Sequence, residues 1–272
     1  MLYNSIGTIT LATIGVVIIL IWLGTIRFPL LPVGNFIVDL IKSRRFLVLL
    51  LAVICILLMN KYELSFEESL DYNADFTPWI YALEGHFVQS VQHIFSNPYV
   101  TQITVFFYII VFQSLLVGSI GVYIIDRNKV LVYAICFAII TNYTVAIPFY
   151  VLFPVNEVWS HPPAGVSFLM LDVFPKFEQE YRPLSGINNC FPSLHTSISV
   201  TIMLLAARSG NMRWRIITGI SSVIILFSIF YLGIHWLTDM IAGTMLGVFA
   251  SSFGIYMAKR TIRKEGTTLL SL

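Results

Sequence analysis

Charged residues are scarce in this sequence. Lysine, arginine, aspartate and glutamate make up 11% of its 272 residues, whereas 57% are hydrophobic and the mean hydropathy is +0.84. A soluble domain of this length would carry roughly a quarter charged residues. The composition therefore excludes a soluble globular protein and predicts an integral membrane protein.

Cysteine and basic tracts are scarce as well. The three cysteines, Cys55, Cys136 and Cys190, lie in different segments and lack the spacing of a metal site. We therefore expect no disulfide framework, no metal and no cofactor. The sequence has no basic tract with interleaved aromatic residues, and we expect no nucleic acid as a partner.

Seven apolar segments are candidates to cross a hydrocarbon core of roughly 30 Å. We therefore predict an all-α fold, a polytopic membrane bundle of about seven transmembrane helices in which a six-helix core follows an N-terminal helix. The first apolar run has no basic region before it and is too long for a signal peptide, so we interpret it as a retained helix. The predicted spans are residues 6–26, 45–62, 99–125, 130–152, 193–210, 214–234 and 237–258.

The chain divides into four parts by this pattern. They are N-terminal transmembrane helices (1–62), an extracytoplasmic segment (63–98), a helical core (99–260) and a cytoplasmic tail (261–272).

Two outer segments are long enough to have structure of their own. In the first, Thr77 as N-cap and Pro78 as first helical residue predict an amphipathic helix lying on the outer membrane surface. The second, residues 153–192, carries six prolines and leads into a histidine motif. A loop of this length is expected to be either functional or disordered.

The distribution of lysine and arginine predicts the orientation. With seven spans and the N-terminus outside, thirteen basic residues lie on the cytoplasmic side and three, Lys61, Lys176 and Arg182, lie outside. We therefore expect the N-terminus outside, the C-terminus in the cytoplasm, and all five histidines on the outer side. The cytoplasmic residues are Arg27, Lys42, Arg44, Arg45, Arg127, Lys129, Arg208, Arg213, Arg215, Lys259, Arg260, Arg263 and Lys264.

His235 and Asp239 form the first candidate catalytic pair. At positions i and i+4 of one helix they share a face, so the carboxylate can accept the imidazole N–H and leave the other nitrogen free to attack. The alternative is an interfacial histidine that pairs with an aspartate favoured by the helix dipole. An ionisable pair at a membrane-segment end is costly to keep without a use.

His195 follows Pro192 and Ser193 at the start of the fifth span. A histidine there could protonate a leaving oxygen, and the unpaired backbone N–H groups of the first helical turn could bind phosphate. Ser193 could equally be an N-cap only, a role compatible with phosphate binding.

Arg182 and Lys176 are the candidate cations of the outer loop. The planar fork of donors on arginine suits phosphate, and Lys176 could add charge. The alternative is that each cation is only a solvated charge of the loop. This alternative is stronger for Lys176 than for Arg182, because Glu178 and Glu180 stand between the two cations.

The order and spacing of these motifs resemble the signature of the phosphatidic acid phosphatase type 2 superfamily. That signature has three parts: Lys, six residues and Arg-Pro; Pro-Ser-Gly-His; and Ser-Arg, five residues, His, three residues and Asp. The resemblance covers roughly residues 99–258. In this sequence the first part is Arg182-Pro183, with Lys176 one residue too close to it. The second part is Pro192-Ser193-Leu194-His195. The third part is Ser228-Ile229 followed by His235 and Asp239, with both spacings kept.

Two departures from the signature bear on the substrate. Ile229 replaces an arginine that helps to hold phosphate, and Leu194 replaces glycine. The Pro-Ser-Leu-His form, with Phe153-Pro154-Val155 upstream, resembles the branch that contains inositol phosphorylceramide synthase. Because a phosphate diester carries one negative charge and a monoester nearly two, an enzyme acting on diesters needs fewer cations.

The resemblance implies a metal-independent enzyme that cleaves a lipid phosphate ester at the extracytoplasmic face, within a core at 99–260. In the scheme it implies, His235 is the nucleophile, Asp239 fixes its tautomer, and His195 is the proton donor and then the base. Arg182, Ser193 and Lys176 bind phosphate, and a membrane lipid is the substrate. Water as acceptor would make the protein a lipid phosphatase, and an alcohol would make it a head-group transferase.

A non-enzymatic lipid-binding protein or transporter is the alternative of another class. Transporters place polar groups near the bilayer midplane and break helices there. In this sequence the ionisable residues gather at one membrane face, and the interiors of the predicted spans carry none. This distribution argues against transport.

Overall fold

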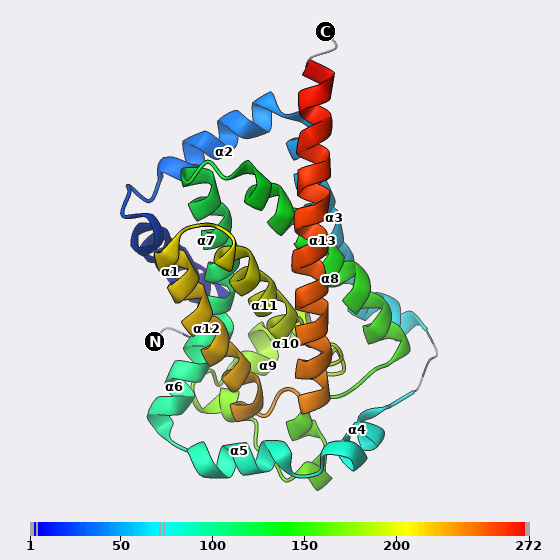
Figure 1. Cartoon of the computed structure of the whole chain (residues 1–272). Coiled ribbons are helices and arrows are strands. Elements are labelled where there is room, and N and C mark those ends of the chain that lie inside the picture. The colour runs from blue at the N-terminus through cyan, green and yellow to red at the C-terminus, as the bar shows by residue number, and fades with distance from the viewer. Residues whose placement is uncertain (1–2, 4, 71, 73, 270–272) are drawn as a thin grey trace.

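A computed structural model of the chain is a bundle of long helices that is closed at one end by short helices and a loop (Figure 1). The structure describes all residues except 1–2, 4, 71, 73 and 270–272. The side chains of residues 64, 68, 184 and 264–269 also lie outside the description, and Lys264 of the predicted cytoplasmic set is among them.

Long apolar helices dominate the fold. Among the described residues, six segments are long and apolar enough to cross a membrane, which confirms the all-α polytopic bundle of an integral membrane protein. They are α1 (Ile6–Thr25), α3 (Arg44–Ser69), α6 (Pro98–Phe106) joined by a π-helical turn (Phe107–Val111) to α7 (Phe112–Ile125), α8 (Lys129–Leu152), α12 (Met212–Tyr231) and α13 (Leu237–Leu269).

The fifth predicted span is shorter than expected. Residues 193–210 form α11 (Leu194–Ala207), an apolar helix of 14 residues. At 1.5 Å per residue it extends over about 21 Å, less than the thickness of a hydrocarbon core. The helix stops at Arg208, where the chain turns toward α12.

Three boundaries differ from the sequence interpretation. Residues 27–44, read as a connection, contain α2 (Leu31–Lys42). Helix α3 continues beyond residue 62 to Ser69, and its last turns contact the loop: Glu63 accepts a hydrogen bond from Asn189 (2.9 Å), and Glu67 accepts one from Asn188. Helix α13 continues through the predicted tail to Leu269.

The surface segment forms two helices rather than one. Helix α4 (Thr77–Glu84) ends at Gly85, and α5 (Phe87–Phe95) follows. The prediction of Thr77 as N-cap is wrong by one residue, because Phe76 is the N-cap and Thr77 is the first helical residue. The hydroxyl of Thr77 instead accepts a hydrogen bond from the backbone N–H of Asn156 (2.8 Å).

The loop of residues 153–192 is ordered and anchored at both ends. Its two ends form a parallel bridge between Val155 and Asn189, with Cys190 N–H donating to the Val155 carbonyl (3.2 Å). Backbone N–H groups of Val158 and Trp159 donate to the turn between α12 and α13. The loop contains 3-10 turns at Val158–Ser160, Pro162–Ala164 and Leu169–Asp172, and the short helices α9 (Phe177–Glu180) and α10 (Arg182–Ser185).

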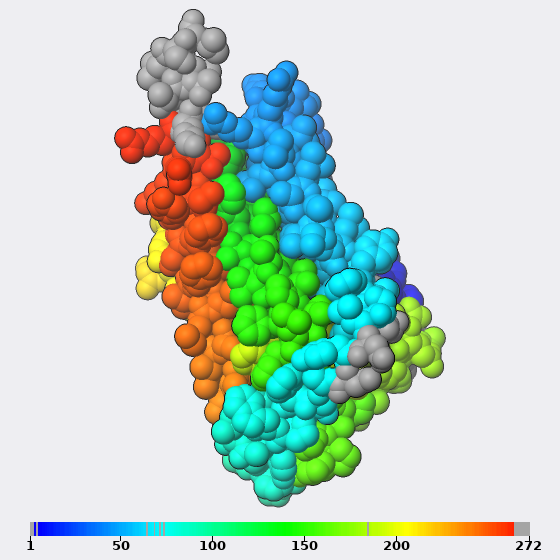
Figure 2. Space-filling model, turned by 90° about the vertical axis from the view of Figure 1, so that its right-hand side faces the viewer, coloured from blue at the N-terminus to red at the C-terminus, as the bar shows by residue number. Residues whose placement is uncertain are grey.

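Helix α8 lies at the centre of one side of the bundle. It packs on α13 along one flank and on α3 along the other, and Figure 2 shows the three helices as adjacent columns. We name the end of the bundle formed by α4, α5 and residues 153–192 the loop end, and the end that carries α2 the α2 end (Figure 1).

Helices α11 and α13 approach each other unusually closely. A Cβ atom added to Gly243 would lie 2.5 Å from the Ser193 carbonyl oxygen, and one added to Gly247 would lie 2.5 Å from the Ser197 carbonyl oxygen. Small residues allow such backbone contact between membrane helices. The contact fixes the start of α11 beside the first turns of α13.

Gly247→Ala should destabilise the protein, because the new methyl group would force α11 and α13 apart. Overpacking of this kind costs about 1–3 kcal/mol. The matched control is Gly219→Ala in α12, where an added Cβ meets nothing within 4 Å. We expect a lower thermal unfolding midpoint in detergent for the first variant and an unchanged or higher one for the second. Equal midpoints would contradict the close contact.

Candidate active site

His235 lies in the tight turn that joins α12 to α13. Gly233 in this turn has a left-handed backbone (φ +79°), and a Cβ there would lie 2.7 Å from the Ser167 carbonyl oxygen, so the position requires glycine. The backbone N–H of His235 donates to the Ile229 carbonyl (3.1 Å). The turn, and not the helix, therefore positions the imidazole.

The predicted pairing of His235 with Asp239 is present, although only Asp239 is helical. Nδ1 of His235 lies 3.3 Å from Oδ2 of Asp239, and the same oxygen accepts the backbone N–H of Trp236 (2.9 Å). Asp239 is fully buried, and its Oδ1 has no hydrogen-bond partner among the described residues. The carboxylate reaches back over the start of α13 and so holds both the turn and the ring.

His195 faces His235 from the start of α11. The two ring centroids are 6.3 Å apart. The His195 ring stacks on the Tyr108 ring, with the two centroids 3.9 Å apart, and its centroid lies 4.3 Å from that of Phe112. The Nε2 atom of His195 is buried without a hydrogen-bond partner among the described residues. Aromatic rings on the π-helical turn (Tyr108) and on α7 (Phe112) thus fix the plane of the imidazole.

Both histidines line one cavity of about 430 Å³. Its apolar wall consists of residues such as Leu116 and Ile198. Its polar wall is rich in neutral groups and contains one carboxylate, Glu157. The polar lining residues are Asn60, Tyr108, Gln113, Tyr143, Tyr150, Glu157, Tyr181, Ser185 and Asn189.

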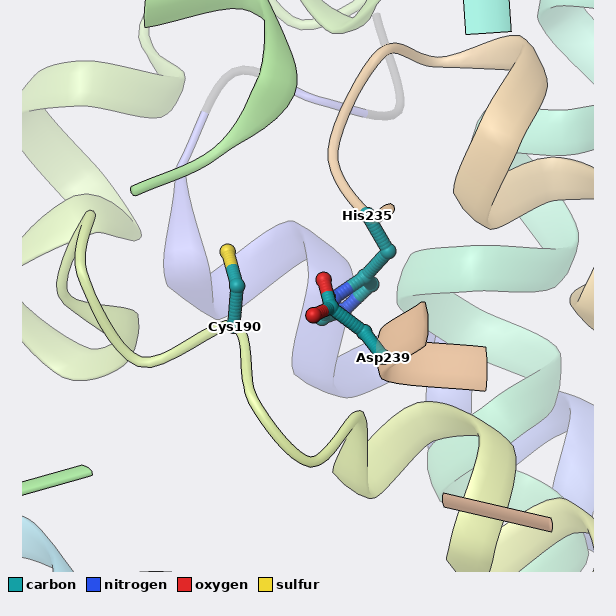
Figure 3. A group of neighbouring side chains, drawn as sticks. All are labelled: Cys190, His235 and Asp239. Carbon is teal, nitrogen blue, oxygen red and sulfur yellow. The ribbon is translucent and has the colours of Figure 1, made fainter. Parts of the chain in front are cut away.

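Cys190 also reaches this site, which the sequence did not predict. Figure 3 shows Cys190, His235 and Asp239 converging from three segments, and one donor atom of each lies within 4.8 Å of the others. Burial raises the pKa of the Cys190 thiol well above its usual range, and the nearby Asp239 adds to the shift. Among the described residues, these three form a group that could hold a metal ion.

Ser193 is an N-cap, as one of the two interpretations proposed. Its hydroxyl oxygen accepts the backbone N–H of Thr196 (3.3 Å), and its own N–H donates to the Asp239 carbonyl (3.2 Å). The residue is fully buried. It therefore ties α11 to α13 at the level of the histidines, and its predicted contact with phosphate stays a prediction.

Arg182 makes five hydrogen bonds within the loop. It donates to both oxygens of Glu157 (2.7 and 2.9 Å), to both oxygens of Glu178 (3.0 and 2.9 Å) and to the Gly186 carbonyl (2.7 Å). A guanidinium has five N–H donors, so all of them are used. Its Cζ also lies 5.0 Å from the centroid of the Phe177 ring.

The pKa shifts of this cluster follow from burial and charge. Burial raises the pKa of Glu157, and its hydrogen bonds to Arg182 only partly offset that effect. Burial alone would lower the pKa of Arg182, but the bonds to Glu178 and Glu157 outweigh it, so the pKa of Arg182 is raised. Arg182 stays charged, and Glu157 is the group that burial moves toward protonation.

Lys176 lies apart from the histidine cavity. It is exposed, precedes α9 and is absent from the cavity lining. Of the two glutamates that stand between Lys176 and Arg182 in the sequence, Glu178 pairs with Arg182 at 2.9 Å.

Glu84 is a second residue that the sequence analysis missed. From the end of α4, its Oε2 accepts the backbone N–H of Leu237 (2.6 Å), and its Oε1 accepts the N–H (2.5 Å) and hydroxyl of Thr238. It thus caps the N-terminus of α13 beside the His235–Asp239 pair. Burial raises its pKa. A capping residue more than 150 positions away leaves no local sequence signal.

The sequence profile of the PAP2 superfamily matches residues 79–253. The match covers more than half of the chain. The chain belongs to the PAP2 superfamily. No curated protein and no solved structure matches it.

Membership in the PAP2 superfamily supports phosphatase-type activity on lipid phosphoesters. The matched region begins in α4 rather than at residue 99, and so includes Glu84 together with every predicted site residue. The superfamily resemblance is thereby confirmed.

Ile229 and Leu194, the two residues that replace arginine and glycine of the PAP2 signature, both have clear positions in the fold. Ile229 is fully buried in the hydrophobic cluster at the loop end, and its carbonyl accepts the N–H groups of Ile234 and His235. Leu194 is half-buried and lines the histidine cavity. Neither position therefore presents a cation to the cavity.

Glu84→Ala should lower kcat because α13 loses the cap that fixes the turn bearing His235. A misplacement of about 1 Å at a reacting group costs up to about 100-fold, and we expect a loss of at least about tenfold. Glu84→Gln, whose amide oxygen still accepts one hydrogen bond, should retain an intermediate rate. Equal activity of Glu84→Ala and the unmodified protein, assayed side by side in detergent micelles, would contradict this role.

Proposed function

We propose that the protein is a lipid phosphatase or phosphotransferase that works through a phosphohistidine intermediate. The observation that carries this proposal is the pair of imidazoles, 6.3 Å apart, that line one cavity, with His235 paired to the buried Asp239. A nucleophile, an orienting carboxylate and a second proton-transfer group are the parts that such chemistry requires.

In the first step, Nε2 of His235 attacks phosphorus in line with the leaving oxygen. Its Nδ1–H donates to Asp239, which keeps the Nε2 lone pair free. The bond from phosphorus to the leaving oxygen breaks as the N–P bond forms, and protonated His195 gives its proton to that oxygen.

In the second step, an acceptor oxygen attacks the phosphohistidine. Neutral His195 removes the proton of this oxygen, the new P–O bond forms, and the N–P bond breaks. Both histidines return to their starting states. Water as acceptor releases phosphate, and an alcohol yields a new phospholipid.

Arg182, Ser193 and Lys176 are the proposed phosphate-binding residues. For Arg182, binding phosphate requires the exchange of a carboxylate of Glu157 or Glu178 for phosphate oxygens, since all five donors are used. Stabilisation of the equatorial oxygens supplies most of the catalysis in phosphoryl transfer.

A diester-using head-group transferase, like inositol phosphorylceramide synthase, is the second candidate. The observation that favours it is the lining of the histidine cavity, which contains Glu157 and no lysine or arginine. A singly charged diester suits such a lining better than a nearly dianionic monoester, because like charges repel strongly in a poorly solvated site.

We further propose that the site faces the extracytoplasmic side, with the N-terminus outside and the C-terminus in the cytoplasm. The support is the excess of basic residues on the side away from the histidines. A membrane lipid would enter from the outer leaflet with its phosphate at head-group depth.

The experiment that tests the function uses purified protein in mixed micelles with lipid monoesters, pyrophosphates and diesters. Free phosphate and new phospholipids are measured together. Phosphate release identifies a phosphatase, and a new phospholipid from a diester without free phosphate identifies a transferase. His235→Ala should abolish either activity and leave the protein folded in detergent, since it removes the nucleophile. Full activity in that variant would refute the mechanism.

A chelator should leave the activity unchanged, because each step above uses only protein groups. The measurement compares initial rates with and without EDTA after extensive dialysis. Loss of activity, followed by recovery on adding Zn²⁺, would overturn this expectation and assign a catalytic metal to Cys190, His235 and Asp239.

A further inference from the structure

A second cavity lies at the α2 end of the bundle. It has a volume of about 520 Å³ and is bounded by α2, the start of α3 and the turn between α7 and α8. It shares no lining residue with the histidine cavity. Lys129 and Tyr150 line the two cavities at opposite ends of α8, about 30 Å apart along the helix axis.

The charged lining of this cavity is mostly basic. Lys42, Arg127 and Lys129 line it together with one carboxylate, that of Asp39. The formal charge of the lining is therefore +3 − 1 = +2. Hydroxyl and amide groups of Asn35, Ser43, Tyr123 and Tyr133 complete the polar wall.

The ends of four described helices meet at this cavity, and their dipoles oppose one another. Helix α3 begins directly after its N-cap Ser43 and α8 begins at Lys129, whereas α2 ends at Lys42 and α7 ends at Ile125. The positive charge of the lining therefore comes from the side chains of Lys42, Arg127 and Lys129, and it suits an anion.

Helix α2 forms one wall of this cavity. Asn35, Val38, Asp39 and Lys42 face the cavity at helical spacing. On another face of the helix, Val33, Ile37 and Ile41 are exposed at 55%, 50% and 79%. An amphipathic helix of this kind lies at the membrane interface with its apolar face in the acyl boundary. The cavity therefore opens where lipid head groups lie.

We propose that this cavity binds the phosphate group of an anionic phospholipid, in the leaflet opposite the active site. Basic pockets between transmembrane helices at a membrane interface bind such head groups. The site is independent of the proposed catalytic function, because neither the histidines nor the loop of residues 153–192 contributes to it.

The test measures the thermal unfolding midpoint of the full-length protein in detergent with increasing short-chain phosphatidylglycerol, phosphatidylcholine or inorganic phosphate. We expect phosphatidylglycerol to raise the thermal unfolding midpoint and phosphatidylcholine at the same concentrations to leave it unchanged. Lys42→Gln/Arg127→Gln/Lys129→Gln should shift the half-maximal phosphatidylglycerol concentration on the order of 100-fold higher.

The matched control is Arg208→Gln/Arg213→Gln/Arg215→Gln, which removes three exposed cations near the turn between α11 and α12. It should respond to phosphatidylglycerol as the unmodified protein does. An equal shift in both triple variants, or an unchanged response of the cavity variant, would overturn the proposal. Equal protection by inorganic phosphate would refute the lipid as ligand. If the cavity variant does not fold, Arg127→Gln alone should give a shift of about fivefold, and no shift would overturn the proposal.

Discussion

The backbone contact between α11 and α13 is the constraint on which the site depends. Gly243 and Gly247 remove the side chains that would separate the two helices, so carbonyl groups of α11 lie directly against α13. The Ser193 N–H then reaches the Asp239 carbonyl at 3.2 Å. Because His195 follows Ser193 by two residues and His235 precedes Asp239 by four, this contact also sets the distance between the two imidazoles. Any larger separation of the helices would move the His195 imidazole away from that of His235.

The loop end is organised by buried charges that compensate one another. Glu157 is 6% exposed, and its carboxylate is matched by the Arg182 guanidinium, which Glu178 holds from the other side. Removing one partner of a buried pair leaves an uncompensated charge and typically costs about 3–5 kcal/mol. Glu84 is compensated differently, by the N-terminus of α13. The bonds between Arg182 and Glu157 join two parts of the proline-rich segment 153–192 that lie 25 positions apart.

The local motifs could be predicted from the sequence, whereas their surroundings could not. Six of the seven predicted spans match long helices, and the predicted His235–Asp239 pair is present, although the turn before α13 rather than a shared helical face brings the two side chains together. By contrast, Tyr108 and Phe112 belong to an apolar run in which nothing marks the residues that stack on His195. Cys190 and Glu84 reach the site through tertiary contacts. Glu178 precedes Arg182 at the i, i+4 spacing of a helical ion pair, whereas nothing in the sequence indicates that Glu157 also binds Arg182.

The pairing of Arg182 with Glu157 and Glu178 bears directly on the charge of the substrate. If a phosphate diester replaces the Glu157 carboxylate on Arg182, one negative charge replaces another and the guanidinium stays matched. The released Glu157 must then be accommodated near the cavity, and its raised pKa means that it takes up a proton at a higher pH than an ordinary glutamate does. A dianionic monoester would add a further negative charge to a lining that contains no lysine or arginine. In a poorly solvated site, where the Coulomb energy of like charges is large, the exchange is less unfavourable for the diester. Under the proposed phosphoryl-transfer function, the arrangement of Arg182 therefore supports a diester substrate for the same electrostatic reason as the replacement of arginine by Ile229.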